Sequence, residues 1–175
     1  MTFKFHLLFA VVYSFTIWSE IRNHENLSKL DYYKFKNLSF LNRYCIFITL
    51  LTLISNVFYY WFSVVTGYRR LRSFKSWFYT CVAFPLNAIT FTMFWSLYLT
   101  NKNLVVNPKT MAMVPWWHNH LTHTMPGLTC ILEIFLTRFK RQKGMTGLKT
   151  ALAFVVAYSI YMIYIFKTMI SFQIF

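Results

Sequence analysis

Hydrophobic residues gather in five stretches, which are separated by short polar connections. The stretches cover residues 5–18, 44–66, 77–99, 116–136 and 148–166. Each of the last four has about the 20 residues that an α-helix needs to cross roughly 30 Å of hydrocarbon. The pattern therefore predicts an all-α, multi-pass transmembrane helix bundle of about five spans, forming a single domain over residues 1–175.

The first stretch is the shortest of the five and contains His6. Lys4 ahead of an apolar run also fits a cleavable signal peptide. However, Trp18-Ser19-Glu20 supplies no small-x-small cleavage site. We therefore expect this stretch to stay in the protein as a span.

The composition agrees with a membrane protein. The chain is 57% hydrophobic and 13% charged, whereas soluble domains have about 25% charged residues and about 45–50% apolar residues. The three cysteines all fall inside the hydrophobic stretches, so no disulfide framework is indicated.

The net charge of +14 raises the question of nucleic-acid binding. The basic residues lie between the stretches, where anionic lipid headgroups are natural counterions, so we expect a membrane and no nucleic acid as partner. The connections after the second and fourth stretches, with Lys4, carry 10 Lys and Arg residues, against 7 on the other side. The positive-inside rule then predicts a cytoplasmic N-terminus. We expect the membrane to be that of the endoplasmic reticulum or the plasma membrane.

Polar residues inside the second stretch recur at steps of three and four, so they share one helix face. They are Cys45, Thr49, Thr52, Asn56, Tyr59 and Ser63. The third stretch repeats the pattern with Thr80, Asn87 and Thr90. Such stripes are typical of contacts between transmembrane helices, and they predict which faces meet.

The segment WWHNHLTHT, residues 116–124, begins the fourth stretch. On a helix, Asn119, His120 and His123 share a face, and His118 points elsewhere. A three-histidine metal site needs convergent ligands, so we expect no metal and no cofactor. Structural histidines and a metal-dependent lipid oxidase remain alternatives.

Catalysis by a histidine base with a hydroxyl nucleophile is the third interpretation of this segment. The second and fourth spans enter the membrane from the same side. Thr49 and His123 then lie roughly 8–10 Å below the same surface, where they can meet. Glu133 lies about 15 Å further along the axis, in the opposite half of the membrane, and is not expected to contact His123.

The run Pro115, Trp117, Asn119-His120 and His123-Thr124 resembles the signature of the androgen-induced and androgen-dependent TFPI-regulating proteins. Phe47-Ile48-Thr49 and Ala83-Phe84-Pro85 support the resemblance, which covers about residues 40–140. His118 matches no position of the family signature.

The resemblance implies a membrane-embedded threonine hydrolase of lipid esters, in particular fatty acid esters of hydroxy fatty acids. Thr49 would be the nucleophile and His123 the general base. Asn56, Asn119 or His120 would contact the substrate or the oxyanion. The lipid's carboxylate would lie near Lys102 or Lys109. The family has six spans, one more than this sequence provides, so a catalytically inactive membrane protein with a structural or interaction role is the alternative.

Overall fold

The computed structural model describes residues 2–28, 47–66, 71–105, 114–140 and 145–173. Within these ranges every regular element is helical, which confirms the predicted all-α class. The elements are α1 (Thr2–Ser28), α3 (Ile48–Thr66), α4 (Arg72–Phe78), η1 (Tyr79–Ala83), α5 (Phe84–Thr100), η2 (Lys102–Leu104), α7 (Trp116–Asn119), η3 (His120–Thr124), α8 (Met125–Leu136) and α9 (Thr146–Gln173).

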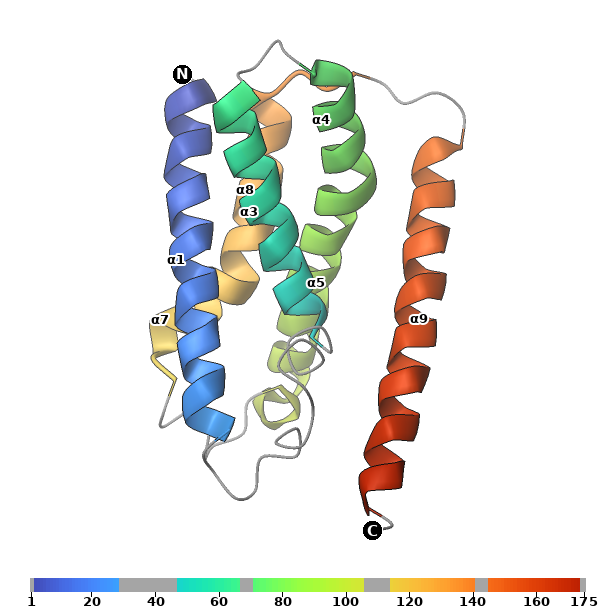
Figure 1. The fold of residues 1–175 in the computed structure, drawn as a ribbon. Helices are drawn as coiled ribbons and strands as arrows, with labels where there is room; N and C mark the ends of the chain where they lie inside the picture. Colours follow the sequence, from blue (N-terminus) through green and yellow to red (C-terminus); the bar gives the residue numbers. More distant parts are fainter. Residues whose placement is uncertain (1, 29–46, 67–70, 106–113, 141–144, 174–175) are drawn as a thin grey trace.

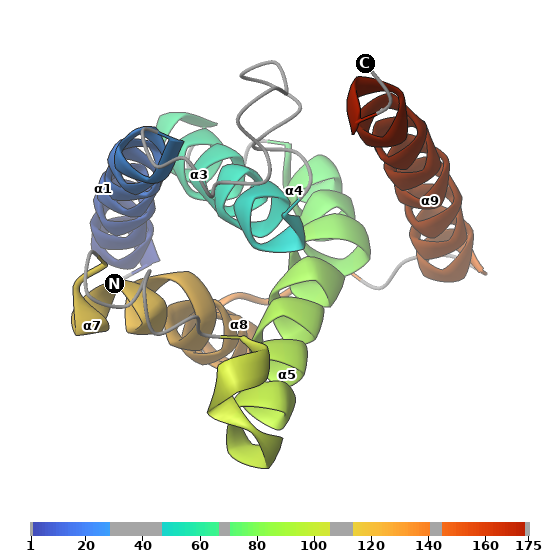
Figure 2. The same ribbon diagram turned by 90° about the horizontal axis from the view of Figure 1, so that it is seen from below.

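Consecutive helices run in opposite directions, and α1, α3, α4–η1–α5 and α7–η3–α8 stand side by side (Figure 1). Seen from below, these four rods surround a common interior, and α9 lies outside them (Figure 2). We call the end with the start of α1, α4 and the end of α8 the upper end. The start of α3, the end of α5 and α7 lie at the lower end (Figure 1).

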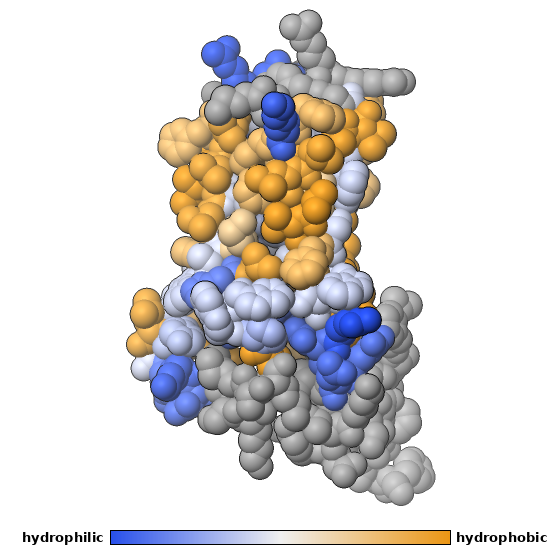
Figure 3. Space-filling view, turned by 90° about the vertical axis from the view of Figure 1, so that its left-hand side faces the viewer, coloured by the Kyte–Doolittle hydropathy of each residue, from blue (hydrophilic) through white to orange (hydrophobic). Residues whose placement is uncertain are grey.

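Among the described residues, three helices are long and apolar enough to cross a membrane: Ile48–Thr66, Arg72–Thr100 and Thr146–Ile165. A broad hydrophobic band covers the face formed by α1, with hydrophilic residues above and below it (Figure 3). These are the features of an integral membrane protein, with α1 and α8 packed beside the candidate spans. The compartment and the direction of insertion remain predictions.

Aromatic side chains fill the upper half of the interior. Tyr13, Tyr59, Tyr60 and Tyr79 are each at most 2% exposed, and the rings of Tyr13 and Tyr60 are stacked with centroids 5.6 Å apart. The hydroxyls of Tyr13, Tyr59 and Tyr79 have hydrogen-bond partners, which offset the cost of removing them from water. Tyr13 Oη, for example, lies 2.6 Å from Thr129 Oγ1 and so links α1 to α8.

The middle of the polar stripe predicted on the second span, at Thr52 and Asn56, lies where α3 contacts α5. Thr52 Oγ1 lies 2.7 Å from Thr90 Oγ1. Asn56 and Asn87 exchange two amide hydrogen bonds, at 2.7 and 3.0 Å. The prediction that these two faces meet is therefore confirmed. Cys45 lies outside the described residues, and Cys81 and Cys130 are buried free thiols.

A second polar group at the upper end joins α1, α3 and α8 around Glu133, which is 0% exposed. Its Oε1 lies 3.0 Å from His6 Nε2. The same oxygen accepts hydrogen bonds from Tyr59 at 2.7 Å and Thr137 at 2.6 Å. A carboxyl group buried in a membrane protein needs such donors, so this group holds three helices together.

Two π-helical turns interrupt the rods, and each comes shortly before a proline. The turn η1 precedes Pro85, and η3 precedes Pro126. A proline inside a helix lacks an N–H, and its ring clashes with the carbonyl four residues earlier. The wider π turn relieves this clash and shifts the side chains around it.

Several predicted boundaries differ from the structure. The first span was predicted to end at residue 18, but α1 continues to Ser28. Its polar residues Ser19 and Glu20 turn inward, where both contact His118. The third span was predicted to begin at residue 77, but its helix begins at Arg72. The added turn contains Lys75, which is buried, because a lysine near the end of a span can bury its aliphatic stem.

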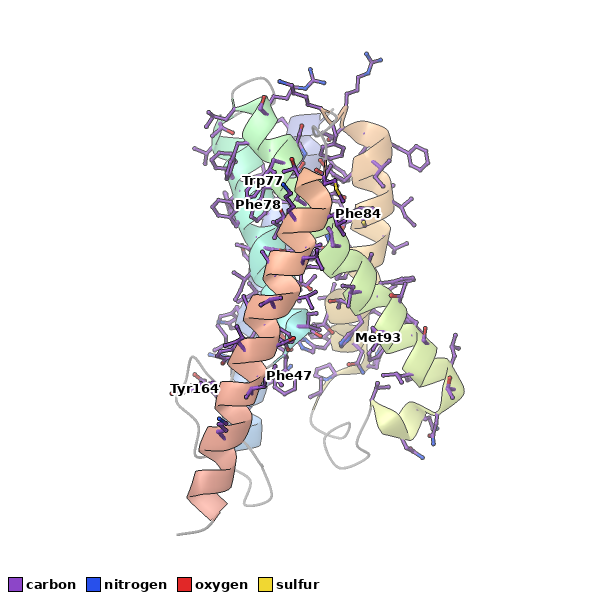
Figure 4. The ribbon with its side chains drawn as sticks, turned by 90° about the vertical axis from the view of Figure 1, so that its right-hand side faces the viewer. Phe47, Trp77, Phe78, Phe84, Met93 and Tyr164 are labelled. Carbon is purple, nitrogen blue, oxygen red and sulfur yellow. The ribbon has the colours of Figure 1, made fainter. Side chains whose placement is uncertain are left out.

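The last helix, α9, is set apart from the other four rods. It meets the bundle mainly at η1, and it crosses in front of α3 and α5 at an angle when seen from its own side (Figure 4). Its apolar side chains, such as Val155, Val156 and Ile160, are more than half exposed. In a bilayer this surface faces lipid.

Candidate active site

Thr49 and His123 come together in the lower half of the bundle. Thr49 stands in the first turn of α3, and His123 lies in the π turn η3. Thr49 Oγ1 lies 3.4 Å from His123 Nε2, and both residues are partly buried. The structure thus brings together the two residues that the sequence placed at the same depth.

The other ring nitrogen of His123 is held by its own segment. Nδ1 lies 2.8 Å from Thr122 Oγ1 and 3.3 Å from the carbonyl oxygen of Asn119. A carbonyl can only accept a hydrogen bond, so the proton of the neutral ring is on Nδ1. Nε2 then presents its lone pair to Thr49.

Thr122 is the residue that fixes this arrangement. It is 1% exposed, and its hydroxyl donates to the carbonyl of His118 at 3.0 Å. Because the hydroxyl hydrogen is used there, the oxygen is left to accept from Nδ1–H of His123. Thr122 could not be singled out from the sequence, since a lone threonine in a polar segment carries no distinctive signal.

Phe94 on α5 covers one face of the His123 ring. The two rings are stacked with centroids 3.8 Å apart and an interplanar angle of 15°. Phe94 is itself 8% exposed, so it can hold the imidazole plane and keep water from that face.

A cavity of about 230 Å³ opens beside the pair. Phe47, Val105 and Val114 supply apolar walls, and Asn119 supplies an amide. Among the described lining residues, Glu20 carries the single carboxylate, and there is no lysine or arginine. The site therefore combines hydroxyl, imidazole and amide groups in a pocket that is lined mostly by polar residues and has apolar residues on part of its wall.

His118 also lines this cavity, although regular helical spacing predicts it on another face and it matches no position of the family signature. It is 3% exposed. Its Nε2 forms a salt bridge with Glu20, and its Nδ1 lies 3.2 Å from Ser19 Oγ. The pair ties α7 to α1 and fixes the segment that carries Thr122 and His123.

Of the remaining predicted site residues, one lines the cavity and two do not. Asn119 lines the cavity. His120 does not, because the π turn breaks the helical spacing that would align it with His123. Instead it is exposed, lies 3.1 Å from Thr124 Oγ1 and lines a smaller pocket with Trp95 and Trp116. Asn56 is fully buried against Asn87 and does not reach the cavity.

The three histidines of residues 118–123 do not converge on one point. His118 faces α1, His120 faces the indole rings of Trp95 and Trp116, and His123 faces Thr49. Among the described residues, no group of three or more His, Cys, Asp or Glu side chains is placed to hold a metal ion.

The chain is 31% identical over 88 residues to the human androgen-dependent TFPI-regulating protein, a match that covers 50% of this chain and 38% of that protein. The mouse protein of the same name matches with the same identity and coverage. Human androgen-induced gene 1 protein is 22% identical over 97 residues, which are 55% of this chain and 41% of that protein.

The aligned segment thus spans about two fifths of the length of these curated relatives. No solved structure matches the chain significantly. The family profile described as FAR-17a/AIG1-like protein matches residues 1–171, which is nearly the whole sequence. The chain belongs to the FAR-17a/AIG1-like family.

Proposed function

We propose that this protein is a membrane-embedded hydrolase of lipid esters, with Thr49 as the nucleophile and His123 as the general base. One observation carries the proposal. The lone pair of His123 Nε2 faces the Thr49 hydroxyl at 3.4 Å, beside a cavity that is open to a substrate. A nucleophile next to a base that a third group orients is the arrangement used in covalent catalysis. Membership of the family is compatible with this activity.

In the first half of the reaction, His123 Nε2 removes the proton of the Thr49 hydroxyl as Oγ1 attacks the ester carbonyl carbon. The tetrahedral intermediate collapses, the carbon–oxygen bond to the alcohol breaks, and the alcohol leaves with the proton from His123. An acyl-threonine remains. In the second half, His123 takes a proton from water, the hydroxide adds to the acyl carbon, and the fatty acid leaves as Thr49 regains its proton.

The negative charge on the intermediate's oxygen needs a hydrogen-bond donor close by. Of the predicted oxyanion residues, Asn119 lines the cavity. Its amide can donate to the oxyanion while its backbone carbonyl holds Nδ1 of His123. One residue would then serve both the base and the charged intermediate.

The cavity's place among candidate membrane spans, together with its apolar wall residues Phe47, Val105 and Val114, supports a lipid as the substrate. At about 230 Å³ it accommodates an ester group with a few methylenes, and the rest of the acyl chains would lie in the surrounding bilayer. Fatty acid esters of hydroxy fatty acids fit this scheme. Their carboxylate would extend to the lower end, where Lys102 in η2 is exposed; Lys109 lies outside the described residues.

Covalent labelling tests the proposal directly. A fluorophosphonate probe should modify the purified protein in detergent or lipid discs, and peptide mass spectrometry should locate the adduct on Thr49. Thr49→Ala should remove the adduct, and His123→Ala should slow its formation by at least about a hundredfold. A folded wild-type protein that takes no label, or a Thr49→Ala variant that still does, would favour the non-catalytic alternative.

A further inference from the structure

A second cavity lies at the upper end, away from the proposed active site. It lies between α1, α3, α4 and the segment that follows α8. Its walls include His6, Arg72, Lys75, Ser76, Thr137 and Arg138. Its interior is about 10 Å³, which is the room taken by one water-sized group. A larger ligand would therefore sit at the mouth and insert a single atom.

Positive side chains from two segments converge around this cavity. Lys75 is 7% exposed, and Arg72 and Arg138 are exposed beside it. Arg72 donates to the carbonyl of Arg138 at 2.8 Å, which ties α4 to the segment after α8. Lys140 Nζ lies 3.3 Å from Ser73 Oγ and adds a fourth positive charge. In Figure 4, long nitrogen-tipped side chains extend from this end.

Negative charge is scarce at the same place. Of the described acidic residues, Glu20 and Glu25 lie in the last third of α1, at the lower end. Glu133 is near, but it is fully buried, and its Oε1 already serves His6, Tyr59 and Thr137. The mouth of the cavity therefore carries a net positive charge that suits an anion.

We infer that this cavity binds the phosphate group of an anionic lipid, with one phosphate oxygen at Lys75 and the others between Arg72 and Arg138. Lysine and arginine are the usual partners of phosphate, and basic pockets between transmembrane helices bind acidic headgroups.

The surroundings favour a lipid over free phosphate. Leu71 and Phe74, from the same turn as Arg72, are 54% and 39% exposed. They offer an apolar surface for acyl chains directly beside the charged mouth. The hydrophobic band also ends at this level, where headgroups would lie (Figure 3). The inference does not depend on the activity proposed for Thr49.

The test compares the thermal stability of the full chain in discs of phosphatidylcholine with that in discs containing about one fifth phosphatidic acid. The acidic lipid should raise the wild-type Tm by about 2–5 °C. Lys75→Met and Arg138→Gln should each lose most of that increase. Lys4→Gln and Lys149→Gln are matched controls, because each removes one positive charge from an exposed lysine near the upper end but outside the cavity. Both control variants should keep the increase in Tm.

Equal losses in all four variants would overturn the inference, because they would show diffuse attraction to the whole basic surface. If Lys75→Met fails to fold, Arg138→Gln still decides the question, since Arg138 is exposed. A third arm adds about 10 mM inorganic phosphate to the protein in neutral detergent. A rise in Tm equal to that from phosphatidic acid would overturn the assignment to a lipid.

Discussion

Thr49 and His123 are 74 positions apart in the sequence, and yet their side chains meet at 3.4 Å across the interface of α3 and η3. This contact is the one that the proposed roles of nucleophile and general base require. We expect Thr49→Ala and His123→Ala each to reduce ester turnover by at least about a thousandfold.

Thr49→Ser is the matched control for these variants. It keeps the hydroxyl and removes one methyl group, so we expect turnover to remain within about tenfold of wild type. The measurement is release of fatty acid from a hydroxy-fatty-acid ester by the purified protein. Similar rates in all three variants would exclude Thr49 and His123 as a catalytic pair.

Thr122 should control how well His123 acts as a base. Thr122→Val removes the oxygen that lies 2.8 Å from Nδ1 and leaves the Asn119 carbonyl at 3.3 Å as the only acceptor. The ring is then held less firmly, so we expect kcat to fall about 10- to 100-fold with KM nearly unchanged.

Thr122→Ser separates this positioning effect from a packing effect. Serine keeps the hydrogen bonds, and kcat should stay within about threefold of wild type. Both variants should have similar Tm values. If the serine variant loses as much kcat as the valine variant, the hydroxyl does not position His123.

The positions of the helices and the approach of Thr49 to His123 could be predicted because both follow from simple repeats. Helix rise along the chain gives depth in the bundle, and the three- and four-residue spacing on α3 gives the face that meets α5 at Asn87 and Thr90. A stripe does not tell which of its polar residues pair with one another. Asn56 was therefore predicted as a site residue, although it pairs with Asn87.

The salt bridge between Glu20 and His118 joins residues 98 positions apart, and nothing local in the sequence links them. The first span was predicted from its hydrophobic residues to end before Glu20, because a charged residue usually marks the end of a span. His120 was misplaced for a different reason. The five-residue π turn before Pro126 rotates its face away from His123, and regular helical spacing does not include such a turn.

Glu133 should matter for stability and not for turnover. Glu133→Leu leaves His6, Tyr59 and Thr137 without their shared acceptor, so we expect the protein to lose about 3–5 kcal/mol of stability. Glu133→Gln keeps one oxygen for the two hydroxyl donors and should lose less than about half of that. Thermal unfolding in detergent measures the difference. A large fall in turnover for a well-folded Glu133→Gln variant would contradict this separation of roles.

Gly127 tests how closely α5 and α8 must pack. A Cβ atom at this position would lie 2.5 Å from Cδ2 and 2.6 Å from Cγ of Phe91. Both atoms belong to the base of the ring, so the side chain cannot avoid the clash by moving its tip. Gly127→Ala should therefore push the two helices apart and destabilise the protein by about 1–3 kcal/mol.

Gly147→Ala is the natural comparison, since its added Cβ would lie 3.8 Å from Cys81 Sγ, an ordinary contact. That variant should unfold within about 1 °C of wild type, because a helical alanine is at least as favourable as glycine. The double variant Gly127→Ala with Phe91→Leu should recover part of the lost stability, because leucine leaves room for the new methyl group. If Gly127→Ala alone unfolds at the wild-type temperature, α5 and α8 are not in close contact at this position. The position of Phe94 over His123 depends on that contact.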